Sequence, residues 1–238
     1  MKTPNVPLID LQNAATDSEQ LKLLDLACRD HGFFLLKNHG IQEEIDDMWK
    51  MSEWFFSQDR EEKLKLLRSE QIPLGFFDRE LTKQKRDLKE VFDFMETRLE
   101  SDINQWPEEA VFKQTMENFF LKSSQVAEKT LELILICLGL TKNEKVFGDS
   151  RTSNARLNYY PTEDPLNLNE KNEVNKLGDM ALHHHTDPGI LTLLLQDMTG
   201  GLQAKSKEFG WIDIEPEKDS IVVNLGDAMQ VWTNDNYI

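Results

Sequence analysis

His185-Thr186-Asp187-Pro188-Gly189, followed by the apolar run Leu191-Thr192-Leu193-Leu194-Leu195, is the most informative stretch of this sequence. The apolar run predicts a short buried strand, because turn-forming Pro and Gly residues precede it. In an extended strand, residues i and i+2 project to the same face, so the imidazole of His185 and the carboxylate of Asp187 can converge on one ion. This spacing indicates a pair of metal ligands at the edge of a strand.

The ligand types in this pair suit non-haem Fe(II), which a facial triad of two histidines and one carboxylate binds with open positions for O2 and small molecules. Taken alone, the same pair is also typical of a surface turn whose carboxylate accepts a backbone hydrogen bond. The remaining histidines all precede the pair: His31, His39, His183 and His184. We interpret the first two as structural and the last two as loop residues, and leave open that one of the latter fills a third ligand position.

The overall charge of the chain excludes one class of partner. The formal net charge is -16 at pH 7, and the isoelectric point is about 4.7. A nucleic-acid partner requires basic clusters that displace counterions from the phosphates, so we expect none here. The acidity is interpreted as a source of solubility and of repulsion between molecules.

Length, cysteine content and apolar content indicate a soluble cytoplasmic protein. The chain has 238 residues, of which 39% are hydrophobic, enough for a substantial core in one large domain or two small ones. Its two cysteines, Cys28 and Cys137, lie in apolar helical patterns and indicate neither a disulfide framework nor a zinc site. The N-terminus lacks a signal-like apolar region, and no stretch approaches the roughly 20 apolar residues that span a bilayer. We therefore expect no membrane partner.

The pattern of predicted elements changes near residue 150. Before it we expect strands at Val6–Asp10 and Phe33–Leu36, a helix that starts at Thr16, and a long helix from Pro107 toward Gly139. After it, short strand candidates alternate with Gly, Pro, Asn and Asp, which is typical of a sandwich or jelly roll. These candidates are Ala155–Tyr160, Leu191–Gln196, Leu202–Ala204, Trp211–Ile214, Ser220–Asn224 and Gln230–Trp232, and Asn167–Gly178 is expected to be an exposed loop.

Several short motifs occur in order along nearly the whole chain. The N-terminal ones are Pro7-Leu8-Ile9-Asp10 and Asp30-His31-Gly32-Phe33-Phe34-Leu35-Leu36-Lys37-Asn38-His39-Gly40-Ile41. Those of the second half are Arg156-Leu157-Asn158-Tyr159-Tyr160-Pro161, the His185–Gly189 stretch, Leu193-Leu194-Leu195-Gln196-Asp197, Gly200-Gly201-Leu202-Gln203 and Val223-Asn224-Leu225-Gly226-Asp227. Together they resemble the 2-oxoglutarate and Fe(II)-dependent dioxygenases of the isopenicillin N synthase-like type.

This resemblance implies an α+β fold with a mostly β core. The core would be a double-stranded β-helix, or jelly roll, whose open mouth holds the iron and whose outside is braced by long scaffold helices. Residues 1–110 would form a mixed N-terminal domain that packs on the jelly roll. Residues 111–238 would contain the scaffold helix and the Fe(II) and 2-oxoglutarate jelly-roll domain.

The resemblance also implies cofactors and residue roles. His185 and Asp187 would be the first two Fe(II) ligands, and Tyr160, helped by Asn158, would hydrogen-bond the carboxylate of the cosubstrate 2-oxoglutarate. Arg156 lies on the same strand face as Asn158, where it either meets an acidic substrate or forms a structural ion pair. A small organic substrate would be hydroxylated, desaturated or cyclised with O2, with release of succinate and CO2 and with ascorbate as a reductant.

The resemblance further predicts residues that this sequence does not contain. The family's third ligand is a histidine beyond the Asn234-Asp235 turn, and an Arg-x-Ser motif after it clamps the far carboxylate of 2-oxoglutarate, whereas this chain stops at Ile238. We therefore expect a C-terminally incomplete chain that lacks the last jelly-roll strands. Two alternatives stay open: a non-catalytic homologue that serves as a binding or interaction module, and an iron oxidase that does not use 2-oxoglutarate.

Overall fold

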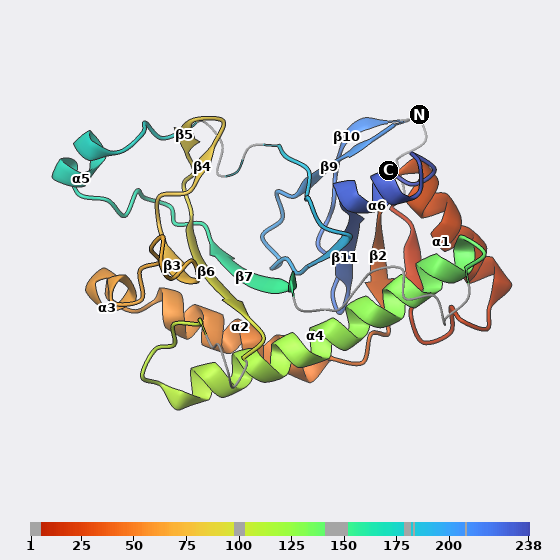
Figure 1. Ribbon diagram of the computed structural model, residues 1–238, viewed down its shortest axis with the longest axis horizontal. Coiled ribbons are helices and arrows are strands. Elements are labelled where there is room, and N and C mark those ends of the chain that lie inside the picture. Colours follow the sequence, from red (N-terminus) through yellow and green to blue (C-terminus); the bar gives the residue numbers. More distant parts are fainter. Residues whose placement is uncertain (1–5, 98–102, 141–151, 179–181, 183, 208) are drawn as a thin grey trace. The chain divides into compact units, whose positions relative to one another are not determined.

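The computed structural model describes residues 6–97, 103–140, 152–178, 182, 184–207 and 209–238, and Figure 1 shows its helices and strands. The contacts within the chain divide it into two compact units. Unit 1 comprises residues 1–42, 123–148 and 186–238, and unit 2 comprises residues 43–122 and 149–185. Each unit is thus assembled from segments that lie far apart in the sequence. The predicted boundary near residue 110 stays a prediction.

Unit 1 contains a four-stranded sheet that joins the two ends of the chain. Its strands are β1 (Leu8–Asp10), β2 (Phe33–Lys37), β11 (Ile221–Leu225) and β8 (Leu191–Leu194), in that order. β1 pairs with β2 in parallel, and β11 pairs antiparallel with both β2 and β8. Figure 1 shows β2 and β11 side by side. The bulky apolar residues of β2 are buried, as expected of a central strand with both faces covered.

The core of unit 1 combines this sheet with a two-stranded hairpin. The hairpin is formed by β9 (Gln203–Ser206) and β10 (Gly210–Asp213). Helix α1 (Ser18–Asp30) contacts β1 and β2, and α6 (Asp227–Trp232) follows β11 directly. One cluster of buried side chains connects the sheet and the hairpin segment: Phe33, Leu35, Ile212, Ile214 and Val222.

Unit 2 is built around an antiparallel sheet of three strands. These are β3 (Gly75–Phe77), β6 (Glu90–Met95) and β7 (Asn154–Tyr159), with β6 in the centre. A small hairpin, β4 (Leu81–Thr82) and β5 (Lys85–Arg86), lies between β3 and β6 in sequence. The helices are α2 (Gln42–Phe56), α3 (Arg60–Leu64), α5 (Leu168–Glu173) and the first part of α4 (Ala110–Cys137), whose second part belongs to unit 1.

Aromatic side chains fill the core of unit 2. Phe55 of α2 and Phe92 of β6 have ring centroids 4.7 Å apart, and Phe112 of α4 lies 5.4 Å from each of them. Such tilted and edge-on contacts add to the stabilisation from apolar burial. Phe55 and Phe56 of α2 are buried, whereas Trp49 of the same helix is only half-buried.

Most of the predicted strands are present within a residue or two of their expected bounds, which is the normal disagreement at element ends. Two predictions of element type are wrong. Gln230–Trp232 belongs to helix α6, not to a strand. The expected loop at Asn167–Gly178 contains helix α5, which Asn167 and Glu170 begin with a reciprocal capping box. The long helix starts at Ala110 and not at Pro107. Within the described part of the chain, no helix is both long enough and apolar enough to cross a bilayer.

Candidate functional site

Asp187 in unit 1 is held by two side chains that lie opposite each other in the sheet. Its Oδ2 atom accepts hydrogen bonds from Thr192 Oγ1 at 2.6 Å and from Asn224 Nδ2 at 2.9 Å. Thr192 on β8 and Asn224 on β11 are directly paired in the antiparallel ladder. Directly opposed residues project to the same face of a sheet, so both donors reach one carboxylate oxygen.

The backbone around Asp187 is fixed by the segment that ends β11 and begins α6. Hydrogen bonds connect residues 186–190 with residues 226–228 through both main chain and side chain. They run from Asp227 N to Asp187 O (2.7 Å), from Gly226 N to Ile190 O (2.9 Å), from Ala228 N to Gly189 O (3.1 Å) and from Thr186 Oγ1 to Asp227 Oδ2 (3.0 Å). We call residues 186–190 the ligand loop and residues 224–228 the clamp.

Position 226 of the clamp has to be glycine, because the neighbouring backbone leaves no space for a side chain. A Cβ atom at this position would lie 2.2 Å from Gly189 O and 2.8 Å from Asp187 O, both of which are backbone atoms of the ligand loop. Its φ of -98° is ordinary for any residue, so the constraint is the close approach of two backbones and not the dihedral angle. The glycine of the Val223–Asp227 motif thus has a packing reason.

His185 lies in the irregular segment that precedes the ligand loop and is exposed. Strand β8 begins only at Leu191, so the expectation that His185 and Asp187 lie on a strand is wrong. The division into units falls directly after His185. Neighbouring His184 has its Nε2 atom 2.7 Å from Lys83 Nζ, which supports its interpretation as a loop residue. His183 lies outside the described residues.

Arg156 of β7 forms a two-point ion pair with Asp93 of β6. Arg156 Nε lies 2.6 Å from Asp93 Oδ1 and Arg156 Nη2 lies 2.7 Å from Asp93 Oδ2, while Nη1 lies 3.4 Å from Glu80 Oε2. The hydrogen bond with Asp93 raises the pKa of Arg156 above its ordinary value. Of the two roles that the sequence left open, the ion pair is the one with visible contacts.

Asn158 and Tyr160 lie at the end of β7 in unit 2. Arg156 and Asn158 share one face of the strand, as predicted, and Asn158 is exposed. Tyr160 follows the strand and is 47% exposed. Partial burial, with a further contribution from the charge of Asp87, raises the pKa of the Tyr160 phenol, so its O–H stays a donor at neutral pH.

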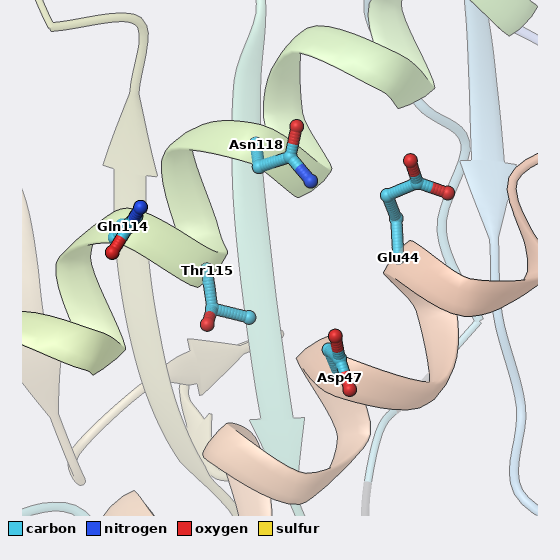
Figure 2. Close-up of a pocket in the computed structure, with 5 residues that line it drawn as sticks. All are labelled: Glu44, Asp47, Gln114, Thr115 and Asn118. Carbon is cyan, nitrogen blue, oxygen red and sulfur yellow. The ribbon is translucent and has the colours of Figure 1, made fainter.

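Among the residues that the structure describes, no group of three His, Cys, Asp or Glu side chains gathers in a geometry that could hold a metal ion. A polar cavity of about 240 Å³ lies in unit 2 between α2 and α4 (Figure 2). Its carboxylates already have cationic neighbours: Asp47 pairs with Lys50 at 2.7 Å, and Glu44 lies 3.9 Å from Lys122. None of the predicted site residues lines it. Its lining residues are Glu44, Asp47, Gln114, Thr115 and Asn118.

Two family models match this chain in consecutive segments. The model described as non-haem dioxygenase in morphine synthesis N-terminal matches residues 6–109, and that of the 2OG-Fe(II) oxygenase superfamily matches residues 151–238. The second match includes His185, Asp187, the ligand loop and the clamp.

Relatives of known sequence agree with these family models. A probable iron/ascorbate oxidoreductase of Dictyostelium discoideum is 31% identical over 98% of this chain and 74% of its own length. The 1-aminocyclopropane-1-carboxylate oxidase 1 of Cucumis melo is 34% identical over 97% of this chain and 71% of its own length. Gibberellin 20 oxidase 1 of Arabidopsis thaliana is 32% identical, and the chain spans only 63% of its length.

A solved structure confirms the predicted fold class. A full-length protein of Neurospora crassa, solved in complex with alpha-KG, superimposes with a TM-score of 0.83 at 29% identity, covering 98% of this chain and 76% of that one. The α+β jelly-roll fold inferred from the motifs is therefore correct.

Proposed function

The chain belongs to the 2-oxoglutarate and Fe(II)-dependent oxygenase superfamily, and we propose that the protein oxidises a small organic molecule with O2 while 2-oxoglutarate is converted to succinate and CO2. Within the molecule itself, one observation carries this proposal. The Asp187 carboxylate is oriented by two neutral donors on a rigid pair of strands, which is how proteins fix a carboxylate that binds a metal.

The two ligand side chains that this chain provides are of types that bind Fe(II). Asp187 supplies a carboxylate oxygen and His185 an exposed imidazole, and both ligand types are those of non-haem iron sites. We therefore assign the two residues as iron ligands. Bound Fe(II) would supply the activation of O2 and the oxidative decarboxylation of 2-oxoglutarate. The protein's share is to orient these ligands and the cosubstrate.

Tyr160 and Asn158 are the residues that we assign to 2-oxoglutarate. The phenol O–H of Tyr160 and the amide N–H of Asn158 are both donors, and a carboxylate accepts hydrogen bonds from either. Both side chains are exposed where β7 ends. Arg156 is retained as a hypothesis for binding an acidic substrate, although Asp93 already occupies its guanidinium.

The name of one relative and the state of the cysteines indicate a reductant and a compartment. One relative is named a probable iron/ascorbate oxidoreductase, so we propose ascorbate as the reductant that keeps the iron ferrous. Both Cys28 and Cys137 are free thiols in the structure, which supports a reducing compartment such as the cytoplasm. The net charge of -16 supports a small-molecule partner over a nucleic acid.

The test is succinate formation by the full-length protein. Supplied with Fe(II), 2-oxoglutarate, ascorbate and O2, the wild type should form succinate slowly even without an added substrate, because ascorbate can then supply the two electrons that the substrate would otherwise give up to the second oxygen atom. His185→Ala and Asp187→Ala should each lower this rate at least about 100-fold, as expected when a metal ligand is lost. Asp213→Asn, a change of carboxylate on strand β10, is the matched control.

The outcomes separate the open alternatives. Succinate formation that is independent of His185 and Asp187 would contradict the proposal. Fe(II) binding without any consumption of 2-oxoglutarate would favour an iron oxidase that does not use this cosubstrate. A folded protein that binds no Fe(II) would favour a non-catalytic binding module.

A further inference from the structure

We propose that Thr192 and Asn224 are positioning residues that determine which oxygen of Asp187 is presented to the iron. This inference rests on the proposed function, because it takes Asp187 to be a ligand. It gives Thr192 on β8 and Asn224 on β11 the role of orienting the Asp187 carboxylate, although neither residue binds the metal itself. The class of ligand served is a divalent cation.

Both hydrogen bonds to the Asp187 carboxylate reach the same oxygen atom. Thr192 Oγ1 and Asn224 Nδ2 both donate to Oδ2 of Asp187, at 2.6 and 2.9 Å. A carboxylate oxygen has two lone-pair directions, so two donors together use the capacity of Oδ2 and fix the plane of the group. Coordination through Oδ1 leaves both hydrogen bonds intact, whereas coordination through Oδ2 must break at least one.

The chemistry of the donors supports the same assignment. A hydroxyl and an amide are neutral, so they orient the carboxylate without cancelling its negative charge, and that charge attracts the cation. A guanidinium in their place would compete with the metal for the same carboxylate. The arginine-bound carboxylate of Asp93 in unit 2 shows that alternative in this protein.

The sheet supplies rigidity to the pair. Because Thr192 and Asn224 are directly opposed in the ladder, their separation is set by the spacing between β8 and β11. The clamp also holds the backbone of the ligand loop just beyond the end of β11, where Asp227 N at the start of α6 donates to Asp187 O at 2.7 Å. A shift of register by one residue would turn both donors to the other face of the sheet. Metal affinity is thereby linked to the pairing of β8 with β11.

The experiment is an anaerobic calorimetric titration of the full-length protein with Fe(II) alone. Thr192→Val removes a hydroxyl at nearly constant volume, and Asn224→Ala removes the amide. Each should weaken Fe(II) binding about 10- to 100-fold, which is the usual effect of losing a residue that orients a metal ligand. Thr192→Ser retains the hydroxyl and should bind Fe(II) like the wild type.

Gln203→Leu is the matched control. Gln203 on β9 donates to Asp213 Oδ1 on β10 at 2.9 Å, and these two residues are also directly opposed in an antiparallel pair. The control therefore removes a hydrogen bond from a neutral strand side chain to an aspartate carboxylate away from the ligand loop, and Fe(II) affinity should not change. The melting temperature of the metal-free protein should fall no further in Thr192→Val than in this control. If Asn224→Ala does not fold, the comparison of Val and Ser at position 192 decides the question.

The failure of this inference differs from the failure of the proposed function. If Asp187→Ala abolishes Fe(II) binding while Thr192→Val and Asn224→Ala bind like the wild type, only the positioning role is overturned. If the wild type does not bind Fe(II), or Asp187→Ala binds it unchanged, the proposed function is overturned and this inference with it.

Discussion

Two carboxylates of this protein, Asp187 in unit 1 and Asp93 in unit 2, are fixed by opposite means. Asp187 is oriented by the neutral donors Thr192 and Asn224. Asp93 is only 3% exposed and is paired with Arg156 at 2.6 Å and with Arg68 at 3.1 Å. Cationic partners neutralise a buried carboxylate, whereas neutral donors such as Thr192 and Asn224 orient a carboxylate without themselves cancelling its charge.

The chain contains 43 Asp and Glu residues, and only one of them, Asp187, is assigned to the iron site. In unit 2 two of the buried or half-buried acidic side chains belong to a structural ion-pair group around β3 to β7. It includes Glu80, Asp93, Arg68, Arg156 and Lys89. Removing one member of such a group leaves a partner without compensation, so these residues should control stability. Changes at the Asp187 site should act on metal affinity instead.

The largest effect on stability is expected from Lys63→Met in unit 2. Lys63 Nζ lies 2.6 Å from Glu90 Oε2, and the two residues are only 5% and 2% exposed. The substitution leaves the Glu90 charge buried without its partner, so the free energy of unfolding should fall by about 3–5 kcal/mol. Urea denaturation measures this change. The double variant Lys63→Met with Glu90→Leu should recover most of the loss, and no recovery would contradict a pairwise role.

Gly226→Ala should give the next largest loss of stability, and it tests whether the clamp needs glycine for lack of space. The new Cβ would meet Gly189 O at 2.2 Å, and backbone atoms of the ligand loop must move to make room. We expect a loss of about 2–3 kcal/mol in the free energy of unfolding, together with weaker Fe(II) binding. Gly189→Ala is the matched control in the same contact, because its Cβ would have no atom within 4 Å. Equal losses in both variants would contradict the packing explanation.

Arg156→Met tests the ion pair against the alternative of substrate binding. Arg68 would still reach Asp93, so the loss in the free energy of unfolding should be about 2 kcal/mol, near that of one charged hydrogen bond. Arg156→Lys should lose less than Arg156→Met but should not match the wild type, because a lysine cannot make the two-point contact. Thermal and urea denaturation provide the measurement. Unchanged stability with a loss of substrate turnover would favour the substrate-binding role.

The smallest effect concerns the pH dependence of stability through Glu80. Burial alone would raise the pKa of Glu80, but Arg156, Arg68 and Lys89 more than offset this, so the pKa lies below its ordinary value of 4.5. A lowered pKa in the folded state stabilises the protein above the unfolded-state value and ceases to do so as the pH falls through the folded-state value. Glu80→Gln should therefore flatten the loss of stability below about pH 4.5. Urea denaturation at a series of pH values measures it, and an unchanged profile would contradict the assignment.

Local sequence patterns predicted many elements of the fold but missed others. The bulky run Phe33–Leu36 and the apolar run after Gly189 predicted β2 and β8, because bulky apolar runs bounded by turn residues are typical of buried strands. Helix α5 was missed, although Asn167 and Glu170 have the spacing of a capping box. The strand prediction at Gln230–Trp232 is wrong because a run of three residues is too short to distinguish the periodicity of a strand from that of a helix.

The sequence alone predicts which residues of the candidate site could bind a metal, but not which residues orient them. The His185 and Asp187 pair is visible as a local motif, whereas the donors to Asp187 come from two strands far apart in sequence. Identifying Thr192 and Asn224 requires the register between β8 and β11, which no local pattern contains. In the sequence the clamp residues form only a motif, and the close approach that requires Gly226 is visible only in the folded backbone.

The most direct test of the central claim is an anaerobic Fe(II) titration of the full-length protein and of Asp187→Asn. Asparagine keeps the shape of the side chain and removes its charge. The account predicts one tightly bound ion per wild-type chain and an affinity at least about 100-fold weaker in the variant, as expected when a ligand's charge is lost. Equal Fe(II) affinity in the two proteins would contradict it.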